Sequence, residues 1–340
     1  MDVQINVVAK EYRFYQDEKG RYNIPKEFQT DVQYGPEIKT LCAVLNTEGL
    51  VAIDRLSSFV RSISHGKLNI SNGSIVNFIK DLKNKGTYIV DKIKEEILNS
   101  QLMNTDGTTS RCNGKNNCVR TYSTTKYTLL KATKGKGKKY IEETGILNNY
   151  FGNICHDHET VIYNYGNKHG ECNVHVSRYL RGDCDNTLNL WSKSMRSFLC
   201  CLNEHKKNLL SKGINGCDKD HLERYSKRYD EILELGFRQN KQVKSKFYRA
   251  EEKKLLSRLK KYKNNHLLFI YDFNMPFDNN MAERDLRHVK SKQKISGCFR
   301  SDEGQQSYLD IKSVILSCKK QCIDFYDIIN KIFKNTPVEI

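Results

Sequence analysis

Three carboxylates that lie far apart in the sequence have positions from which they could bind the same divalent cations. Asp106 lies in MNTDGTT, a segment with the composition of a strand, and Asp157 ends the short strand-like segment NICHD. Glu283 follows two asparagines in DNNMAERDLR. Two Mg²⁺ or Mn²⁺ ions held by such oxygen ligands activate the attacking oxygen of a phosphodiester reaction and stabilise the leaving one. Spacing alone is a weak signal, because the chain has 40 Asp and Glu residues.

The residues before Glu283 predict the start of a helix. The side chains of Asp278, Asn279 and Asn280 can accept hydrogen bonds from the free N–H groups of a first helical turn. Arg287 lies four residues beyond Glu283, on the same helix face. A capped surface helix with an internal salt bridge is the alternative interpretation of this pattern.

The elements around the first two carboxylates read as a mixed α/β sheet. Thr, Tyr, Val and Leu are frequent in three short segments that predict strands: QLMNTDGTTSR, NNCVRTYSTT and KYTLLKATK. A short helix in KKYIEETGIL, a strand in GNICHD, a helical piece and a strand in GECNVHV follow. This order is typical of a ribonuclease H-like domain with five strands.

The segments on either side of this sheet are predicted to be helical. Apolar residues recur every three or four positions between Ile38 and Lys85, and two short helices joined by a tight link are typical of a helix-turn-helix. An ordinary helical hairpin is the alternative. The candidate DNA contacts in the second helix are Ser71, which is also a candidate N-cap, Asn72, Ser74 and Asn77.

The chain is therefore expected to have five parts. They are a lead-in that is the remnant of an N-terminal segment (1–37), a helical DNA-binding region (38–98), the first part of the catalytic core (99–185), an α-helical insertion (186–266), and the second part of the core with a basic C-terminal tail (267–340).

The charge of the chain favours a polyanionic partner. The net charge is +17, and residues 186–266 hold +11 of it, with 20 Lys or Arg against 9 Asp or Glu. No apolar run approaches the length of a membrane span, and the N-terminus lacks the order of a secretory signal. We expect a cytoplasmic protein whose partner is double-stranded DNA, with no membrane association and with its 12 cysteines reduced.

The sequence resembles the insertion sequence 66 family of DDE transposases. The run PFDNNMAERDLRHVKSKQKISGCFRSDEG resembles the C-terminal signature of that family. Further stretches match in order: VQYGPEIKTLCAVLNTEGLVAIDRLSSFV, ISNGSIVNFI, TDGTTSRCNGK, GNICHDHETVIYNYGNKHGECNVHVSRYL and NHLLFIYDF.

The resemblance implies a ribonuclease H-like catalytic domain in which Asp106, Asp157 and Glu283 bind two Mg²⁺ or Mn²⁺ ions. It implies a bacterial transposase that binds terminal inverted repeats and catalyses DNA strand cleavage and strand transfer. Such an enzyme is expected to act as a homo-oligomer on the element's ends and target DNA, with accessory proteins of the same element as further candidate partners.

Two features depart from the family pattern. The segment EYRFYQDEKGRYNIPKEF has no cysteine, whereas family members generally have a zinc-binding segment there, and Asp-Gly-Thr replaces the Asp-Glu-Thr of many relatives. The alternative is therefore a catalytically decayed copy that acts only as a DNA-binding protein. A general ribonuclease H-like nuclease is a third interpretation.

The remaining candidate residues have supporting roles in this interpretation. Arg284 and Arg287 would bind DNA phosphates or orient Glu283. A basic series suits a track along a DNA backbone, although it is also compatible with a solvated helix face: Lys290, Lys292, Lys294 and Arg300.

Cys172 and His175 form a C-x-x-H pair that resembles a motif after the second Asp of several transposase families. Zinc is not expected, because two ligands do not make a tetrahedral site, although His156, His158 and His169 are near in sequence. A structural cysteine and a histidine that supports the site or contacts DNA are predicted instead.

Trp191, the single tryptophan, opens the insertion. Stacking on a flipped base is one interpretation of this residue, and a core anchor is the one we favour.

Overall fold

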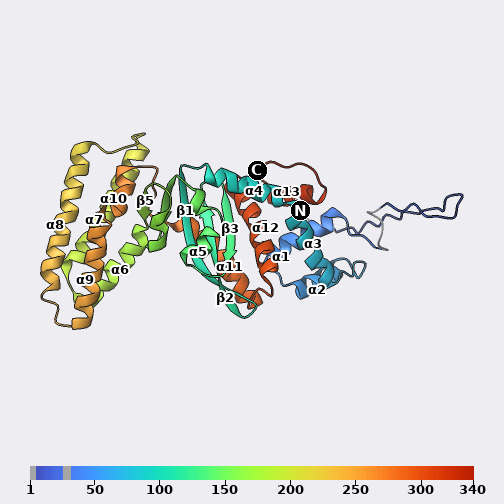
Figure 1. The fold of residues 1–340 in the computed structure, drawn as a ribbon, viewed down its shortest axis with the longest axis horizontal. Helices are drawn as coiled ribbons and strands as arrows, with labels where there is room; N and C mark the ends of the chain where they lie inside the picture. Colours follow the sequence, from blue (N-terminus) through green and yellow to red (C-terminus); the bar gives the residue numbers. More distant parts are fainter. Residues whose placement is uncertain (1–4, 26–31) are drawn as a thin grey trace. The chain divides into compact units, whose positions relative to one another are not determined.

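The computed structural model describes residues 5–25 and 32–340 (Figure 1). The predicted lead-in thus lies partly outside the described residues. The described chain divides into two compact units, one formed by segments of 1–93, 110–115 and 289–340, the other by 94–109 and 116–288. Residues 289–340, which we expected to complete the catalytic core, belong to the same unit as the N-terminal helices.

A mixed five-stranded sheet forms the centre of the second unit, and it confirms the predicted α/β class. The strand order is β3-β2-β1-β4-β5. The strands are β1 (Leu102–Cys112), β2 (Lys115–Ser123), β3 (Thr128–Thr133), β4 (Asn153–His156) and β5 (His169–Glu171). β2 pairs antiparallel with β3, whereas β4 is parallel to both β1 and β5. The strand predicted in GECNVHV ends at Glu171, because a helix begins two residues later.

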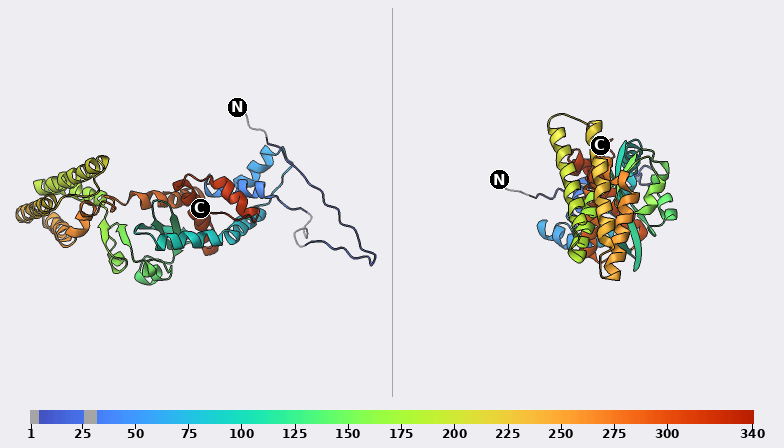
Figure 2. Two further views of the ribbon diagram at one scale, coloured as in Figure 1. Left: turned by 90° about the horizontal axis from the view of Figure 1, so that it is seen from above. Right: turned by 90° about the vertical axis from the view of Figure 1, so that its left-hand side faces the viewer.

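Helices account for the rest of this unit. They are α5 (Lys138–Glu142), α6 (Asn173–Thr187), α7 (Leu190–Ser211), α8 (Lys219–Asn240), α9 (Lys246–Lys261) and α10 (Lys263–Tyr271), with 3-10 turns η2 (Leu147–Asn149) and η3 (Thr160–Asn164). The helices α7 to α9 of the predicted insertion lie alongside one another (Figure 2). Two helices, α4 (Thr87–Leu98) and α11 (Asn280–Ser296), contribute residues to both units.

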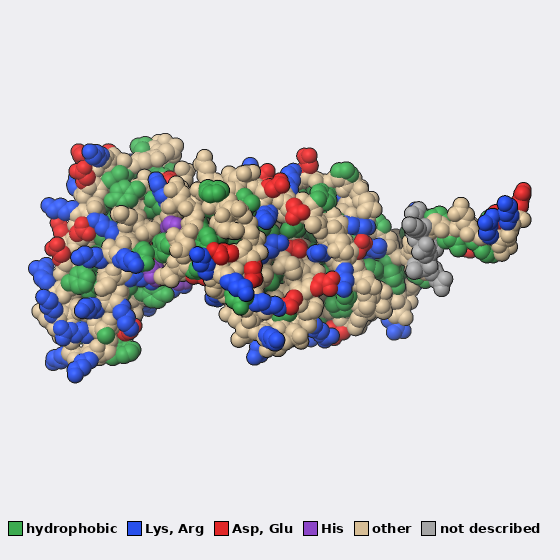
Figure 3. Space-filling view, viewed as in Figure 1, with side chains coloured by type: hydrophobic (Ala, Val, Ile, Leu, Met, Phe, Trp, Pro, Cys, Tyr) green, Lys and Arg blue, Asp and Glu red, His purple; other side chains and the backbone are tan. Residues whose placement is uncertain are grey.

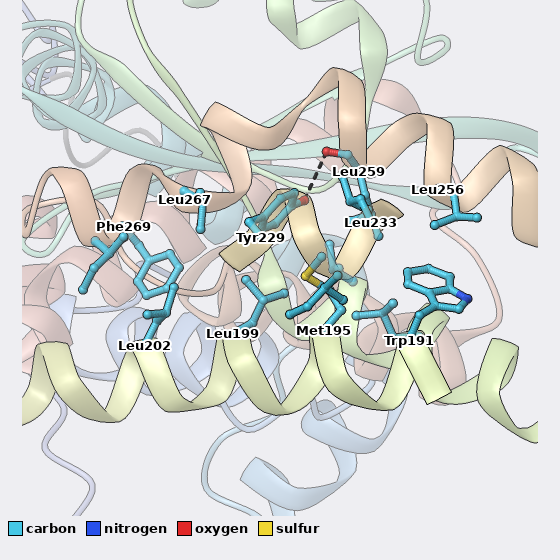
Figure 4. Packing of buried hydrophobic residues seen from close by; sticks show 14 of the residues in the cluster. Trp191, Met195, Leu199, Leu202, Tyr229, Leu233, Leu256, Leu259, Leu267 and Phe269 are labelled. Carbon is cyan, nitrogen blue, oxygen red and sulfur yellow. Dashed lines mark hydrogen bonds between the residues drawn. The ribbon is translucent and has the colours of Figure 1, made fainter. Parts of the chain in front are cut away.

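The helices of the insertion pack around an apolar core. Apolar residues recur on α7 at intervals of three and four, which places them on one helix face. The core includes Trp191, Met195, Leu199 and Leu202 of α7, Tyr229 and Leu233 of α8, Leu256 and Leu259 of α9, and Leu267 and Phe269 of α10 (Figure 4). The Tyr229 hydroxyl donates to the Leu259 carbonyl at 3.1 Å. Trp191 is fully buried, as expected of a core anchor.

The first unit is helical. It contains α1 (Pro36–Thr47), α2 (Ile53–Ile63), α3 (Asn72–Lys85), α12 (Asp302–Lys320) and α13 (Phe325–Phe333), together with most of α4 and the end of α11. The Ser71 hydroxyl accepts a hydrogen bond from the Ser74 backbone N–H at 3.0 Å, so the predicted N-cap of α3 is confirmed. No helix in the described part of the chain is long and apolar enough to cross a membrane.

Candidate active site

The parallel pairing of β1 with β4 brings two of the predicted carboxylates together. Thr105 of β1 is opposite His156 of β4. The residue that follows each of them is an aspartate: Asp106 follows Thr105, and Asp157 follows His156. Because parallel strands run in the same direction, both aspartates lie toward the same edge of the sheet. Fifty residues separate them in sequence, and the register alone makes them neighbours.

Strand β1 also fixes the residue that precedes the Glu283 helix. The Asn279 side-chain amide donates to the Thr105 carbonyl and accepts from the Asn104 side chain, both at 2.9 Å. All three residues are buried. Glu283, in the first turn of α11, is thereby held to the strand that contains Asp106.

The helix begins where the sequence predicted, but the two asparagines have different roles. The Asp278 carboxylate accepts from the Asn280 backbone N–H at 3.0 Å and so stabilises the first turn. Asn280 is exposed, whereas the Asn279 side chain bonds β1 and does not cap the helix. The Asn279 backbone N–H donates to the Cys172 sulfur at 3.2 Å.

Asp106 is influenced by both other carboxylates. Burial, followed by the negative charge of Asp157 and with a smaller contribution from Glu283, raises the pKa of Asp106 from 3.8 to about 6. A hydrogen bond of 2.7 Å from the Gly107 backbone N–H to Asp106 opposes this rise, as does the positive charge of Arg120. Three carboxylates with mutually repelling charges are a favourable environment for a cation.

A second group of donor atoms lies around Asp157. Asp157, Cys172, His175 and Glu283 each offer one donor atom, and the four atoms lie within 4.8 Å of one another. His175 Nδ1 is 3.1 Å from Asp157 Oδ1 and 3.6 Å from Glu283 Oε1. Asp157, followed by Cys172, raises the pKa of His175 to about 10. The C-x-x-H pair therefore lies directly against two of the three predicted acids.

The donor set is suited to a divalent cation. Asp157 Oδ1 and Glu283 Oε1 are buried, and both lie close to His175 Nδ1, which forms an ion pair with Asp157. Buried carboxylate oxygens are energetically costly unless a positive charge neutralises them, and either the protonated His175 or a metal ion can do so. The carboxylate oxygens of Asp157 and Glu283 are hard donors, and Cys172 and His175 would add softer ones; Asp106 is not among these four residues.

His158, one of the histidines near Cys172 in sequence, belongs to a different network, which is centred on Glu171. The Glu171 carboxylate accepts from Arg258 at 2.7 Å and is 2.8 Å from His158 Nδ1. Burial alone would raise the pKa of Glu171, but His158, His266 and Arg258 lower it. This network links the end of β5 to helices α9 and α10. Sequence reasoning missed Glu171, although it ends β5, whereas Asp157 directly follows the last residue of β4.

The predicted DNA-contacting residues differ in exposure. The exposed ones are Arg284, Arg287, Lys290, Lys294, Arg300, Ser71, Asn72 and Asn77, and Ser74 is half-buried. Lys292 is different: its Nζ is buried and donates to the Asn46 carbonyl at 3.1 Å. Burial lowers the pKa of Lys292 to about 8. The expectation that Lys292 contacts a DNA backbone is therefore wrong, because its ammonium group faces the protein interior.

Comparison with known protein families gives a match over most of the chain. The family model described as "Transposase IS66 family" matches residues 31–307, which include all three predicted acids. No curated protein matches the chain.

Proposed function

The chain belongs to the IS66 transposase family, and we propose on that premise that it cleaves DNA at the ends of a mobile element and joins them to target DNA. The observation that supports this chemistry most strongly is the convergence of Asp106, Asp157 and Glu283 from two strands and a helix. A ribonuclease H-like catalytic domain places its acids in this way, and we assign the mixed sheet to that type.

The proposed reaction uses the carboxylates as metal ligands. Paired Mg²⁺ or Mn²⁺ ions would activate the attacking oxygen and stabilise the leaving one, first in strand hydrolysis and then in strand transfer. Asp106, Asp157 and Glu283 would hold the ions, and no covalent bond between protein and DNA is needed. His175, between two of these acids, is proposed to position them.

Protein–DNA contacts are proposed on both units. In the catalytic unit, Arg284 and Arg287 lie exposed beyond Glu283 on α11. Lys290 and Lys294 continue the same helix, and Arg300 follows it. Cations spaced in this way can contact successive phosphates without reading sequence.

Terminal inverted repeats would be recognised by the helices of the first unit. The exposed start of α3, with Ser71, Asn72 and Asn77, is the proposed contact, together with Ser74. Double-stranded DNA at the ends and the target is the proposed partner. A homo-oligomer would bridge the two ends, and accessory proteins of the element are further candidate partners.

The catalytic assignment is tested by replacing each acid with its amide. Asp106→Asn, Asp157→Asn and Glu283→Gln are each expected to abolish Mg²⁺- or Mn²⁺-dependent cleavage of duplexes that carry the element's ends. Binding of the same duplexes should persist, because the exposed cations remain. Glu234→Gln, which changes an exposed carboxylate on α8, is the matched control and should cleave normally.

Undiminished cleavage in any of the three amide variants would refute the role of that residue. If the unaltered chain binds these duplexes but cleaves them neither with Mg²⁺ nor with Mn²⁺, the catalytically decayed copy would be favoured. Cleavage without end preference or strand joining would favour a general nuclease.

A further inference from the structure

The turn between α8 and α9 displays aromatic and basic side chains together. Phe247 is 68% exposed and Tyr248 37% exposed, and their rings contact edge to face with centroids 5.4 Å apart. Residues 241–249, which we call the α8–α9 tip, contain four exposed cations and no carboxylate: Lys241, Lys244, Lys246 and Arg249. Lysine and arginine side chains gather over this end of the insertion (Figure 3).

Two exposed leucines lie in the adjoining turn between α6 and α7. Leu188 is 82% exposed and Leu190 63% exposed. The Trp191 backbone N–H donates to the Gln239 side chain at 3.0 Å, which joins this turn to the end of α8. Leu188 has a φ of 60°, a left-handed conformation that is uncommon for a leucine. Two further exposed apolar side chains thus lie at the end of α6 and the start of α7, a segment that is bonded to the end of α8.

Buried hydrogen bonds between the residues that flank the tip hold it in place. Glu252 is buried and accepts hydrogen bonds from Trp191 Nε1 at 2.6 Å, Asn189 at 2.7 Å and Asn240 at 2.8 Å. The Asn240 side chain also donates to the Arg249 carbonyl at 2.8 Å. The tip is thus displayed on a fixed scaffold, in which Trp191 fills the core.

Two cations of the tip lie where a helix disfavours positive charge, although Ser245 caps the start of α9. The first turn of α9 has no acidic residue, and it contains Lys246 and Arg249, whose charges repel the positive end of the helix dipole. No carboxylate of the described residues pairs with any of the four cations, whereas Lys254, one turn further, pairs with Glu251 at 2.6 Å. Residues that conflict with their local structure are expected at functional sites.

We propose that the α8–α9 tip binds single-stranded or locally melted DNA. Phe247 and Tyr248 would stack on unpaired bases, and the surrounding lysines and arginine would contact the adjacent phosphates. Proteins that bind single strands combine aromatic platforms with positive charge in this way. The faces of bases in an intact duplex are already stacked, so the aromatic contribution is specific to unpaired DNA. The concentration of positive charge without carboxylates favours a nucleic acid over a protein partner.

The test measures DNA binding by the full chain in EDTA, so that strand cleavage plays no part. Fluorescence anisotropy would follow a labelled oligothymidine strand and a duplex of the same length. The double variant Phe247→Ala/Tyr248→Ala is expected to bind the single strand about tenfold more weakly and the duplex within about twofold of the original chain. The matched control Phe151→Ala removes an aromatic side chain that is 82% exposed elsewhere and should change neither affinity.

The contribution of charge is tested separately. Lys244→Gln/Lys246→Gln should reduce the salt dependence of single-strand binding, lowering the slope of log K against log salt by about 1.4 if each lysine contacts one phosphate. In the unaltered chain, photocrosslinking to a bromouracil-containing strand should modify Phe247 or Tyr248, a measurement that needs no variant to fold.

Unchanged single-strand affinity of the aromatic variant, or crosslinks that lie only elsewhere, would overturn the proposal. An equal loss for single strand and duplex would reduce the tip to a phosphate contact and would also overturn base stacking. A change in sedimentation without a change in DNA affinity would reassign the surface to protein contacts. A chain that binds through the tip but never cleaves would leave this inference intact while refuting the proposed catalysis.

Discussion

Asn279→Ala should destabilise the second unit far more than the adjacent substitution Asn280→Ala. Both asparagines suit a helix start by sequence, but only Asn279 is buried and bonded to β1. Alanine at 279 would remove the acceptor of the Asn104 amide and the donor to the Thr105 carbonyl. Asn280 is exposed, and a surface change of this kind stays within about 0.5 kcal/mol.

The size of the effect follows from the groups that are left behind. Asn104 and Thr105 are each 1% exposed, so water does not replace the lost partner. A buried polar group without a partner costs about 1–3 kcal/mol. Two such groups give an expected loss of roughly 2–6 kcal/mol in the free energy of unfolding, a large part of the stability of a typical domain.

The assay can use the single tryptophan. Trp191 is fully buried in the same unit as Asn279, so its fluorescence during urea unfolding reports on that unit. Cleavage provides a second readout, measured well below the urea midpoint. Because Glu283 lies one turn beyond Asn279, Asn279→Ala should lose cleavage even where it is folded.

Equal urea midpoints for Asn279→Ala and Asn280→Ala would refute the argument that strand β1 anchors α11. Normal cleavage by folded Asn279→Ala would refute the narrower claim that this anchor positions Glu283.

Two further predictions concern buried charges. Burial, followed by the charge of Glu252, raises the pKa of Asp183 from 3.8 to about 7. Between about pH 4 and 7 the folded unit therefore retains a proton that the unfolded chain releases. The free energy of unfolding should fall as the pH rises through this range. Asp183→Asn should flatten this decline and raise the urea midpoint near pH 8; a parallel decline in the variant would contradict it. Lys292→Met should leave the salt dependence of duplex binding unchanged, because Lys292 is buried, whereas Lys294→Gln should lower its slope by about 0.9. Equal slopes for the two variants would show that one of these assignments is wrong.

Local sequence predicted many of the elements. Composition predicted the strand that contains Asp106 and a short strand ending at Asp157, which in the structure ends one residue earlier, and the polar run before Glu283 predicted where α11 begins. The family signature was recognisable from the same residues. These signals are readable because strand alternation, helix periodicity and capping depend on residues a few positions apart.

The partners of individual side chains depended on distant parts of the chain. Asn279 and Thr105 are 174 residues apart, and nothing near either one indicates their hydrogen bond. Lys292 has the composition of a solvated helix face, yet the Asn46 carbonyl binds its ammonium group in the interior.

The aromatic residues of the insertion also show which properties local sequence predicts and which depend on tertiary packing. The sequence marked Trp191 as an aromatic at the start of a basic helical segment, and a core anchor was the interpretation favoured over base stacking. Which aromatics remain at the surface depended on how α7, α8 and α9 pack: Trp191 fills their core, and Phe247 and Tyr248 are left exposed beside four cations. Burial is a property of surfaces that meet in three dimensions, so the tertiary structure alone decided it.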